Sequence, residues 1–198
     1  MKKGVLTLSL LLVAIFIIFR FCNTKPDKVM QEKSVPLSIS ENSGSFNESF
    51  SQLLQSYFSL KDAFIESDTV KVNAAAGELM QYADSLHVNE IKGDSSGTIT
   101  ETAKIFSATI SSSAQALAAE KGIEEKRKEF ETLSDALWNL TRTVRFDKQT
   151  VYYVYCPMAL DNKGAYWLSD KKEIRNPYFG SKMLNCGEIA DSVHYSKR

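Results

Sequence analysis

Four sulfur-bearing side chains gather in the last quarter of the chain and offer its most distinctive chemistry. They are Cys156, Met158, Met183 and Cys186. Thiolate and thioether sulfurs are soft, polarisable donors that prefer Cu(I) and similar ions, whereas Mg²⁺ and Ca²⁺ prefer oxygen. The residue types therefore predict a site for a thiophilic metal ion, Cu(I) or Ag(I), with these four side chains as its ligands.

The spacing of the four residues is compatible with one site. Cys156 and Met158 are two positions apart and would point the same way in an extended segment. Met183 and Cys186 are three apart and would share one face of a helical turn or tight loop. This geometry could bring the four sulfur atoms together.

Two other states of the cysteines are compatible with the same sequence. Cys156 and Cys186 could form a structural disulfide with the methionines as apolar gap-fillers, or both could be plain buried thiols. Trp167 could cover a Cu(I) ion through its ring face, but a tryptophan there is more often part of the core. The compartment of the protein bears on this choice, because paired cysteines tend to oxidise outside the cytoplasm.

The start of the chain is typical of an export signal. A short basic start, residues 1–3, precedes an apolar run of 16 residues from Gly4 to Phe19, which Arg20 ends. As a helix this run would span about 24 Å, less than the roughly 30 Å of a bilayer core. Cys22 follows where a bacterial lipoprotein carries its lipid. We expect a lipoprotein or an uncleaved signal anchor facing the periplasm, with a cleaved soluble form as the third alternative.

The remaining chain divides by composition. After the signal or anchor segment, 1–22, we expect a flexible linker over 23–45, a helical bundle over 46–146, and a Cys/Met-rich C-terminal segment over 147–198 packed on the bundle. The 24 basic and 24 acidic residues cancel, so nothing indicates a nucleic-acid partner.

Helical periodicity dominates from residue 50 to residue 144 and predicts a mostly α fold, an up-down four-helix bundle. Ser45 or Asn47 is expected to cap the first helix, and Asp68 the second. The third helix should bury its apolar face, which consists of Ile105, Phe106, Ile110, Ala114 and Leu117. The fourth should begin with a solvated charged run, residues 124–129, and then bury Phe130, Leu133, Leu137, Leu140 and Val144.

Beyond the bundle the period changes to two. Residues 150–155 are β-branched and aromatic, and 165–168 form a second short apolar run, with the turn formers 161–164 between them. The two runs predict a small C-terminal β-hairpin.

No catalytic constellation is evident. A nucleophilic mechanism requires a positioned histidine, and the two in the chain, His87 and His194, are expected in a turn and in the terminal tail. Haem, phosphate-loop and di-iron motifs are absent as well. We therefore expect a binding or interaction protein and no enzymatic activity.

The C-terminal motifs resemble a bacterial domain-of-unknown-function family. The resemblance covers roughly residues 46–189 and is carried by these stretches: Cys156-Pro157-Met158-Ala159, Trp167-Leu168, Ile174-Arg175-Asn176-Pro177-Tyr178-Phe179-Gly180 and Met183-Leu184-Asn185-Cys186-Gly187. The family occurs alone on exported proteins or attached to periplasmic adaptor (membrane fusion) proteins of heavy-metal efflux systems. The resemblance implies metal handling beside such an adaptor as partner. A looser similarity to the small heavy-metal-binding domain of copper and silver efflux adaptors lacks its usual histidine, since Ala159 stands there.

Overall fold

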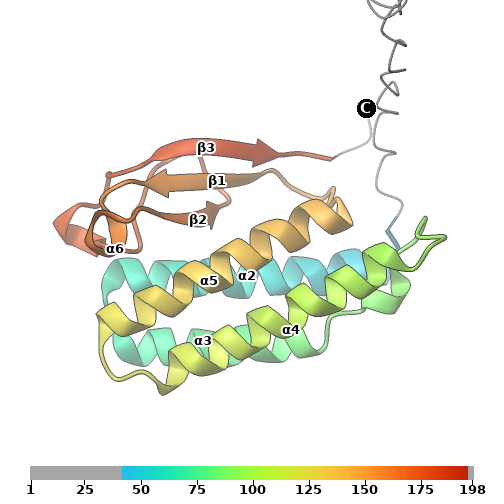
Figure 1. The fold of residues 1–198 in the computed structure, drawn as a ribbon, viewed down its shortest axis with the longest axis horizontal. Coiled ribbons are helices and arrows are strands. Elements are labelled where there is room, and N and C mark those ends of the chain that lie inside the picture. The colour runs from blue at the N-terminus through green and yellow to red at the C-terminus, as the bar shows by residue number, and fades with distance from the viewer. Residues whose placement is uncertain (1–41, 196–198) are drawn as a thin grey trace, which may run out of the picture. The chain divides into compact units, whose positions relative to one another are not determined.

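The computed structural model describes residues 42–195, which lie within one compact unit. Four long helices are followed by a small sheet, as predicted from the hydrophobic periodicity (Figure 1). The elements in chain order are α2 (Gly44–Glu66), α3 (Thr69–Asp84), η1 (Val88–Glu90), α4 (Thr98–Ala119), α5 (Ile123–Val144), β1 (Val151–Cys156), α6 (Ala159–Asn162), β2 (Ala165–Ser169), η2 (Gly180–Lys182) and β3 (Glu188–Val193). Within this range no helix combines the length and the apolarity needed to cross a bilayer.

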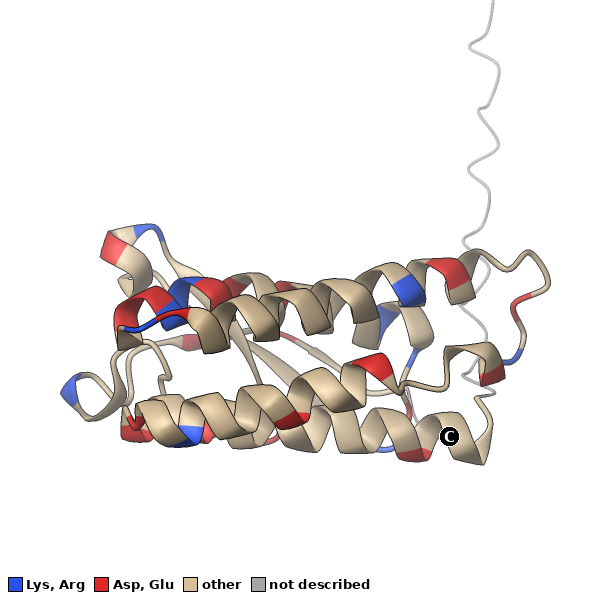
Figure 2. Cartoon of the chain, turned by 90° about the horizontal axis from the view of Figure 1, so that it is seen from below, with Lys and Arg blue, Asp and Glu red and all other residues tan. Residues whose placement is uncertain are grey.

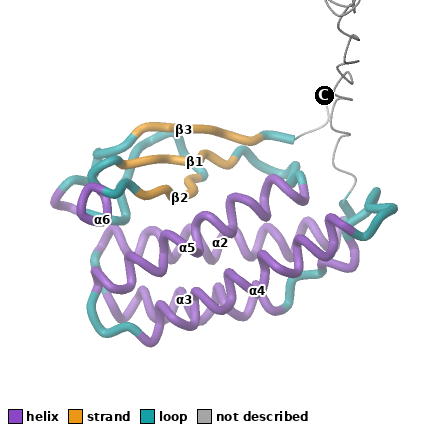
Figure 3. Tube along the Cα trace, in the orientation of Figure 1, coloured by secondary structure: helices purple, strands orange, loops and turns teal. Residues whose placement is uncertain are grey.

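The helix ends follow from local capping chemistry. The Asp68 carboxylate accepts hydrogen bonds from the backbone N–H groups of Val70 and Lys71, which confirms the predicted start of α3. The cap of α2 is Ser43, whose hydroxyl accepts from the N–H of Phe46, so this helix begins earlier than the predicted Ser45 or Asn47 cap. Consecutive helices contact one another along the bundle, and Figure 3 shows the four of them side by side.

An aromatic cluster joins α2 to α5 in the middle of the molecule. The ring centroids of Phe64 and Phe130 lie 4.8 Å apart, and Tyr57 stacks on Phe130 with centroids 5.4 Å apart. The Tyr57 hydroxyl also bonds to the Ser134 hydroxyl at 2.8 Å. These buried rings contribute apolar contact between the two helices.

Two expectations about which helix residues are buried were wrong. Ile105 is 65% exposed on α4, whereas Ile110, Ala114 and Leu117 are buried as expected. Conversely, Lys126 and Arg127, in the charged run expected to be solvated, are only 1% and 4% exposed. The Lys126 ammonium donates to the carbonyls at the C-terminal end of α4, which have no partner inside their own helix. Elsewhere the charges are mixed, and Figure 2 shows acidic and basic residues interspersed along the helices.

The C-terminal sheet has three antiparallel strands in the order β2–β1–β3. The β1–β2 hairpin was predicted, and β3 adds a strand that was not. The outer edge of β2 faces the bundle, because the backbone N–H of Leu168 donates to the Tyr57 hydroxyl at 3.0 Å. The sheet therefore lies against the α2–α5 layer, and α3 and α4 form the layer beyond it (Figure 1).

Candidate functional site

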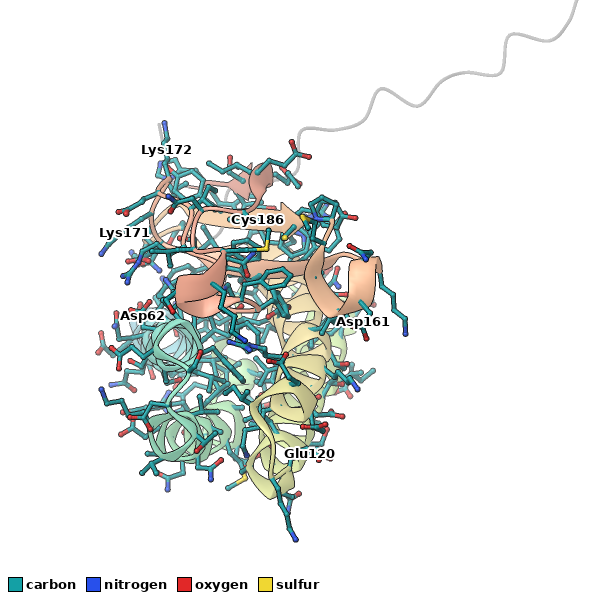
Figure 4. All side chains as sticks on the ribbon, turned by 90° about the vertical axis from the view of Figure 1, so that its left-hand side faces the viewer. Asp62, Glu120, Asp161, Lys171, Lys172 and Cys186 are labelled. Atoms are coloured by element: carbon teal, nitrogen blue, oxygen red, sulfur yellow. The ribbon has the colours of Figure 1, made fainter. Side chains whose placement is uncertain are left out.

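The two cysteines of the C-terminal segment are direct neighbours. Cys156, the last residue of β1, is fully buried, whereas Cys186 is half-buried in the turn before β3. Both are free thiols, and their Sγ atoms lie 2.8 Å apart. Figure 4 shows Cys186 on the sheet side of the molecule, away from the helical layers. The fold thus brings together two of the four predicted sulfur ligands.

A close approach between Gly187 and the sheet places Cys186 beside Cys156. A Cβ atom on Gly187 would lie 2.8 Å from the Trp167 ring and 3.0 Å from the Tyr155 carbonyl oxygen, and the Gly187 φ angle is +144°. Only glycine satisfies both conditions without strain. The Trp167 side chain is 1% exposed and belongs to the core beneath this turn.

Asn176 organises the loop that carries Cys186. It is fully buried, and its side-chain amide donates to the Cys186 carbonyl oxygen at 2.7 Å. Its side-chain oxygen accepts from the N–H groups of Tyr178 and Phe179, while its own N–H donates to the Leu184 carbonyl. One buried amide therefore fixes both ends of the loop.

Arg127 attaches the same loop to the bundle. Its Nε atom donates to the Pro177 carbonyl at 2.9 Å, and its guanidinium also bonds to the Phe64 carbonyl, the Ser67 hydroxyl and the Glu124 carboxylate. Sequence reasoning missed this residue because it was assigned to a charged, solvated run. A signal was present, however, since Arg127 lies three positions before the buried Phe130 and so shares its face of α5.

The two methionines take different positions. Met183 lies half-buried in the same turn as Cys186, whose N–H donates to the Met183 carbonyl at 3.1 Å. Met158 lies beyond the end of β1 with helical backbone angles, so the extended geometry that would have aligned it with Cys156 is not present. Its side chain is 44% exposed and lines a surface pocket that neither cysteine lines.

The contact between the two sulfurs affects proton binding by Cys186. The hydrogen bond with Cys156, followed by burial, raises the pKa of the Cys186 thiol to about 11. Cys186 is therefore a thiol near neutral pH, and any metal ion bound there must displace its proton. Among residues 42–195, no group of three or more His, Cys, Asp and Glu side chains is placed to hold a metal ion.

A stack of aromatic rings fixes the hairpin above α5. Trp138 stacks on Tyr153 with centroids 4.4 Å apart, and Tyr166 stacks on the other face of Tyr153 at 4.5 Å. The Tyr153 hydroxyl donates to the Asp135 carboxylate. These contacts hold β1, and with it Cys156, at a defined height above the helix.

A comparison with protein families gives a match over the helical part of the chain. The family described as "Protein of unknown function (DUF3347)" matches residues 53–149. Over this stretch the chain is similar to DUF3347. The match confirms the expected resemblance to a domain of unknown function in its general form. It ends before β1, so it includes none of the four sulfur residues, and the DUF3347 match does not extend to the C-terminal motifs. The comparisons with curated proteins and with solved structures gave no match.

Proposed function

We propose that the protein binds a thiophilic metal ion, Cu(I) or Ag(I), through Cys156 and Cys186. The observation that supports this is the juxtaposition of two free thiols, one buried and one half-buried, with Sγ atoms 2.8 Å apart. Two thiolates supply both the soft donors and the negative charge that a monovalent soft cation requires. The proposed role is sequestration of the ion or its delivery to an efflux system.

Metal binding requires a small rearrangement of the pair. Metal–thiolate bonds are about 2.3 Å long, so two sulfurs that share an ion must separate beyond their present 2.8 Å. Cys186 can move more easily than Cys156, because it lies in a turn and Cys156 ends a paired strand. Met183 lies in the same turn and is the nearer candidate for a third donor, whereas Met158 would have to leave its pocket.

We expect the metal affinity to rise with pH. The raised pKa of Cys186, about 11, keeps this thiol protonated throughout the range from pH 6 to pH 8. Each proton displaced by the metal then gives about a tenfold gain in affinity per pH unit. Competition titrations at three pH values with a chelator of known pH dependence measure this slope. A flat profile would contradict ligation by Cys186.

The proposed location is the cell envelope, beside a heavy-metal efflux adaptor protein as partner. The proposal rests on the basic start, the apolar run and Cys22, which lie outside the described residues, and on the resemblance of the C-terminal motifs. The anchor would hold the binding segment at the membrane surface where such an adaptor operates.

Replacement of Cys22 by serine distinguishes the two kinds of anchor. A lipoprotein loses lipid labelling in Cys22→Ser, because the thiol is the attachment point, whereas a signal-anchored protein stays in the membrane fraction unchanged. Metabolic labelling and fractionation measure both properties, with Cys186→Ser as the matched control. Recovery of the unsubstituted protein wholly in the soluble fraction would exclude both anchors.

The same observation favours a second candidate, a structural or interaction module closed by a Cys156–Cys186 disulfide. The present separation approaches the bond length of about 2.05 Å, so little movement is required. Exchange with an oxidised thiol partner would form the S–S bond as both thiols lose their protons and two electrons pass to the partner disulfide. Titration of Cu(I) into the reduced protein against a competing chelator distinguishes the two candidates.

A further inference from the structure

A pocket of about 410 Å³ lies at one end of the molecule, separate from the cysteine pair. Three segments of the chain form it: the first turns of α5, the turn between β1 and β2, and the loop after Asn176. Pockets that hold small ligands are commonly about 300–1,000 Å³ in volume. In Figure 4, Asp161 marks the turn at this end, apart from Cys186.

The wall of the pocket combines apolar surface with two unpaired charges. Met158, Leu160 and Phe179 supply the apolar part. Lys128 and Asp161 supply an ammonium and a carboxylate, and among the described residues neither group has an ion-pair partner. The other carboxylate at the pocket, that of Glu124, is already bound to Arg127 at 2.7 Å.

The turn that presents Leu160 and Asp161 has an uncommon backbone. Leu160, Asp161 and Asn162 have φ angles of 50°, 59° and 64°, three consecutive residues in the left-handed region. Side chains other than glycine disfavour this region, and strained residues concentrate at functional sites. The strain is held in place by hydrogen bonds from the N–H groups of Lys163 and Gly164 back to Leu160 and Ala159.

The charges select one ligand class. A simple cation would meet the Lys128 ammonium, and a simple anion would meet the carboxylates of Asp161 and Glu124. A zwitterion satisfies both free charges, with its carboxylate toward Lys128 and its ammonium toward Asp161. We propose that this pocket binds a zwitterion with an apolar side chain, of amino-acid to dipeptide size. Its apolar part lies on Met158, Leu160 and Phe179.

Titration of the full chain with the dipeptide Leu-Phe tests this site. The methyl resonance of Met158 in a ¹³C-methyl-methionine spectrum should shift and saturate, while that of Met80, on α3, should not. N-acetyl-Leu-Phe-amide, which has neither charge, should bind at least about fivefold more weakly, as expected for loss of an exposed ion pair. Free leucine in a parallel titration establishes whether one residue is sufficient.

Variants of the two charged residues test which end of the ligand each residue binds. Lys128→Gln keeps helix propensity and Asp161→Asn tolerates the left-handed backbone, so both variants should fold. Each should weaken Leu-Phe binding about fivefold. Lys128→Gln should leave Leu-Phe-amide unaffected, and Asp161→Asn should leave N-acetyl-Leu-Phe unaffected.

The matched controls Lys92→Gln and Asp84→Asn, both exposed and outside the pocket, should bind as the unsubstituted protein does. The proposal is overturned if the Met158 methyl shows no saturable shift up to about 10 mM dipeptide, a limit well above a millimolar dissociation constant. It is equally overturned if capped and uncapped dipeptides bind alike, or if the pocket variants match the controls.

Discussion

Cys156→Ser and Cys186→Ser should each abolish most of the Cu(I) affinity of the reduced protein. The thiolate charge offsets that of the cation, and a serine hydroxyl is a hard donor that stays protonated at neutral pH. We expect a loss on the order of 100-fold, which corresponds to about 2.8 kcal/mol at about 1.4 kcal/mol per tenfold change. Competition with a Cu(I) chelator under reducing conditions measures it.

Methionine variants are the matched controls for this experiment. Met183→Leu keeps the side-chain volume and removes the sulfur, so it should weaken binding less than either cysteine variant. Met158→Leu should have the smallest effect, since Met158 lines a pocket that neither cysteine lines. Stoichiometry below about one half of an ion per chain, or affinity indifferent to both cysteines, would reject the metal proposal.

The disulfide candidate predicts another pattern in the same variants. Either serine variant would lower the free energy of unfolding of the oxidised protein by about 2–5 kcal/mol, and no variant would change metal binding. Alkylation and mass spectrometry of protein taken directly from the envelope, with and without added copper, then report which state is present.

Arg127→Met should destabilise the protein by about 1–3 kcal/mol. The substitution keeps the apolar stem but leaves the buried Pro177 carbonyl without the guanidinium that it now binds, whereas the Phe64 carbonyl keeps its bond from the Ser67 N–H. An unsatisfied buried acceptor costs about 1–3 kcal/mol. Urea unfolding of the full chain measures the change in free energy.

The loss of stability in Arg127→Met should also be greatest in one part of the molecule. Because Arg127 attaches the Asn176 loop to α2 and α5, amide hydrogen exchange in residues 176–187 should accelerate more than in α3 or α4. Lys128→Met, the adjacent exposed position, is the control and should change stability by no more than about 0.5 kcal/mol. Equal stability of the two variants would show that Arg127 does not hold the loop.

The sequence alone determined the architecture of the helical part and the hairpin. Apolar residues at intervals of three and four can be buried together only on one face of a helix, so the four helices, the Asp68 cap and the bundle could all be predicted. The change to a period of two similarly predicted β1 and β2. These features depend on interactions between residues close in the chain, and such interactions can be inferred from spacing.

The tertiary structure decided the contacts that residue spacing could not predict. Whether the sulfurs meet depends on Gly187 lying against Trp167 and on Asn176 holding the Cys186 turn, contacts between segments far apart in sequence. The burial of Arg127 likewise depends on a loop some 50 positions later, whose carbonyl offers a partner for the charge. Hydrophobic periodicity carries no information about such contacts. From spacing alone a charged residue is predicted to be exposed to solvent, because its partners in the fold are not known.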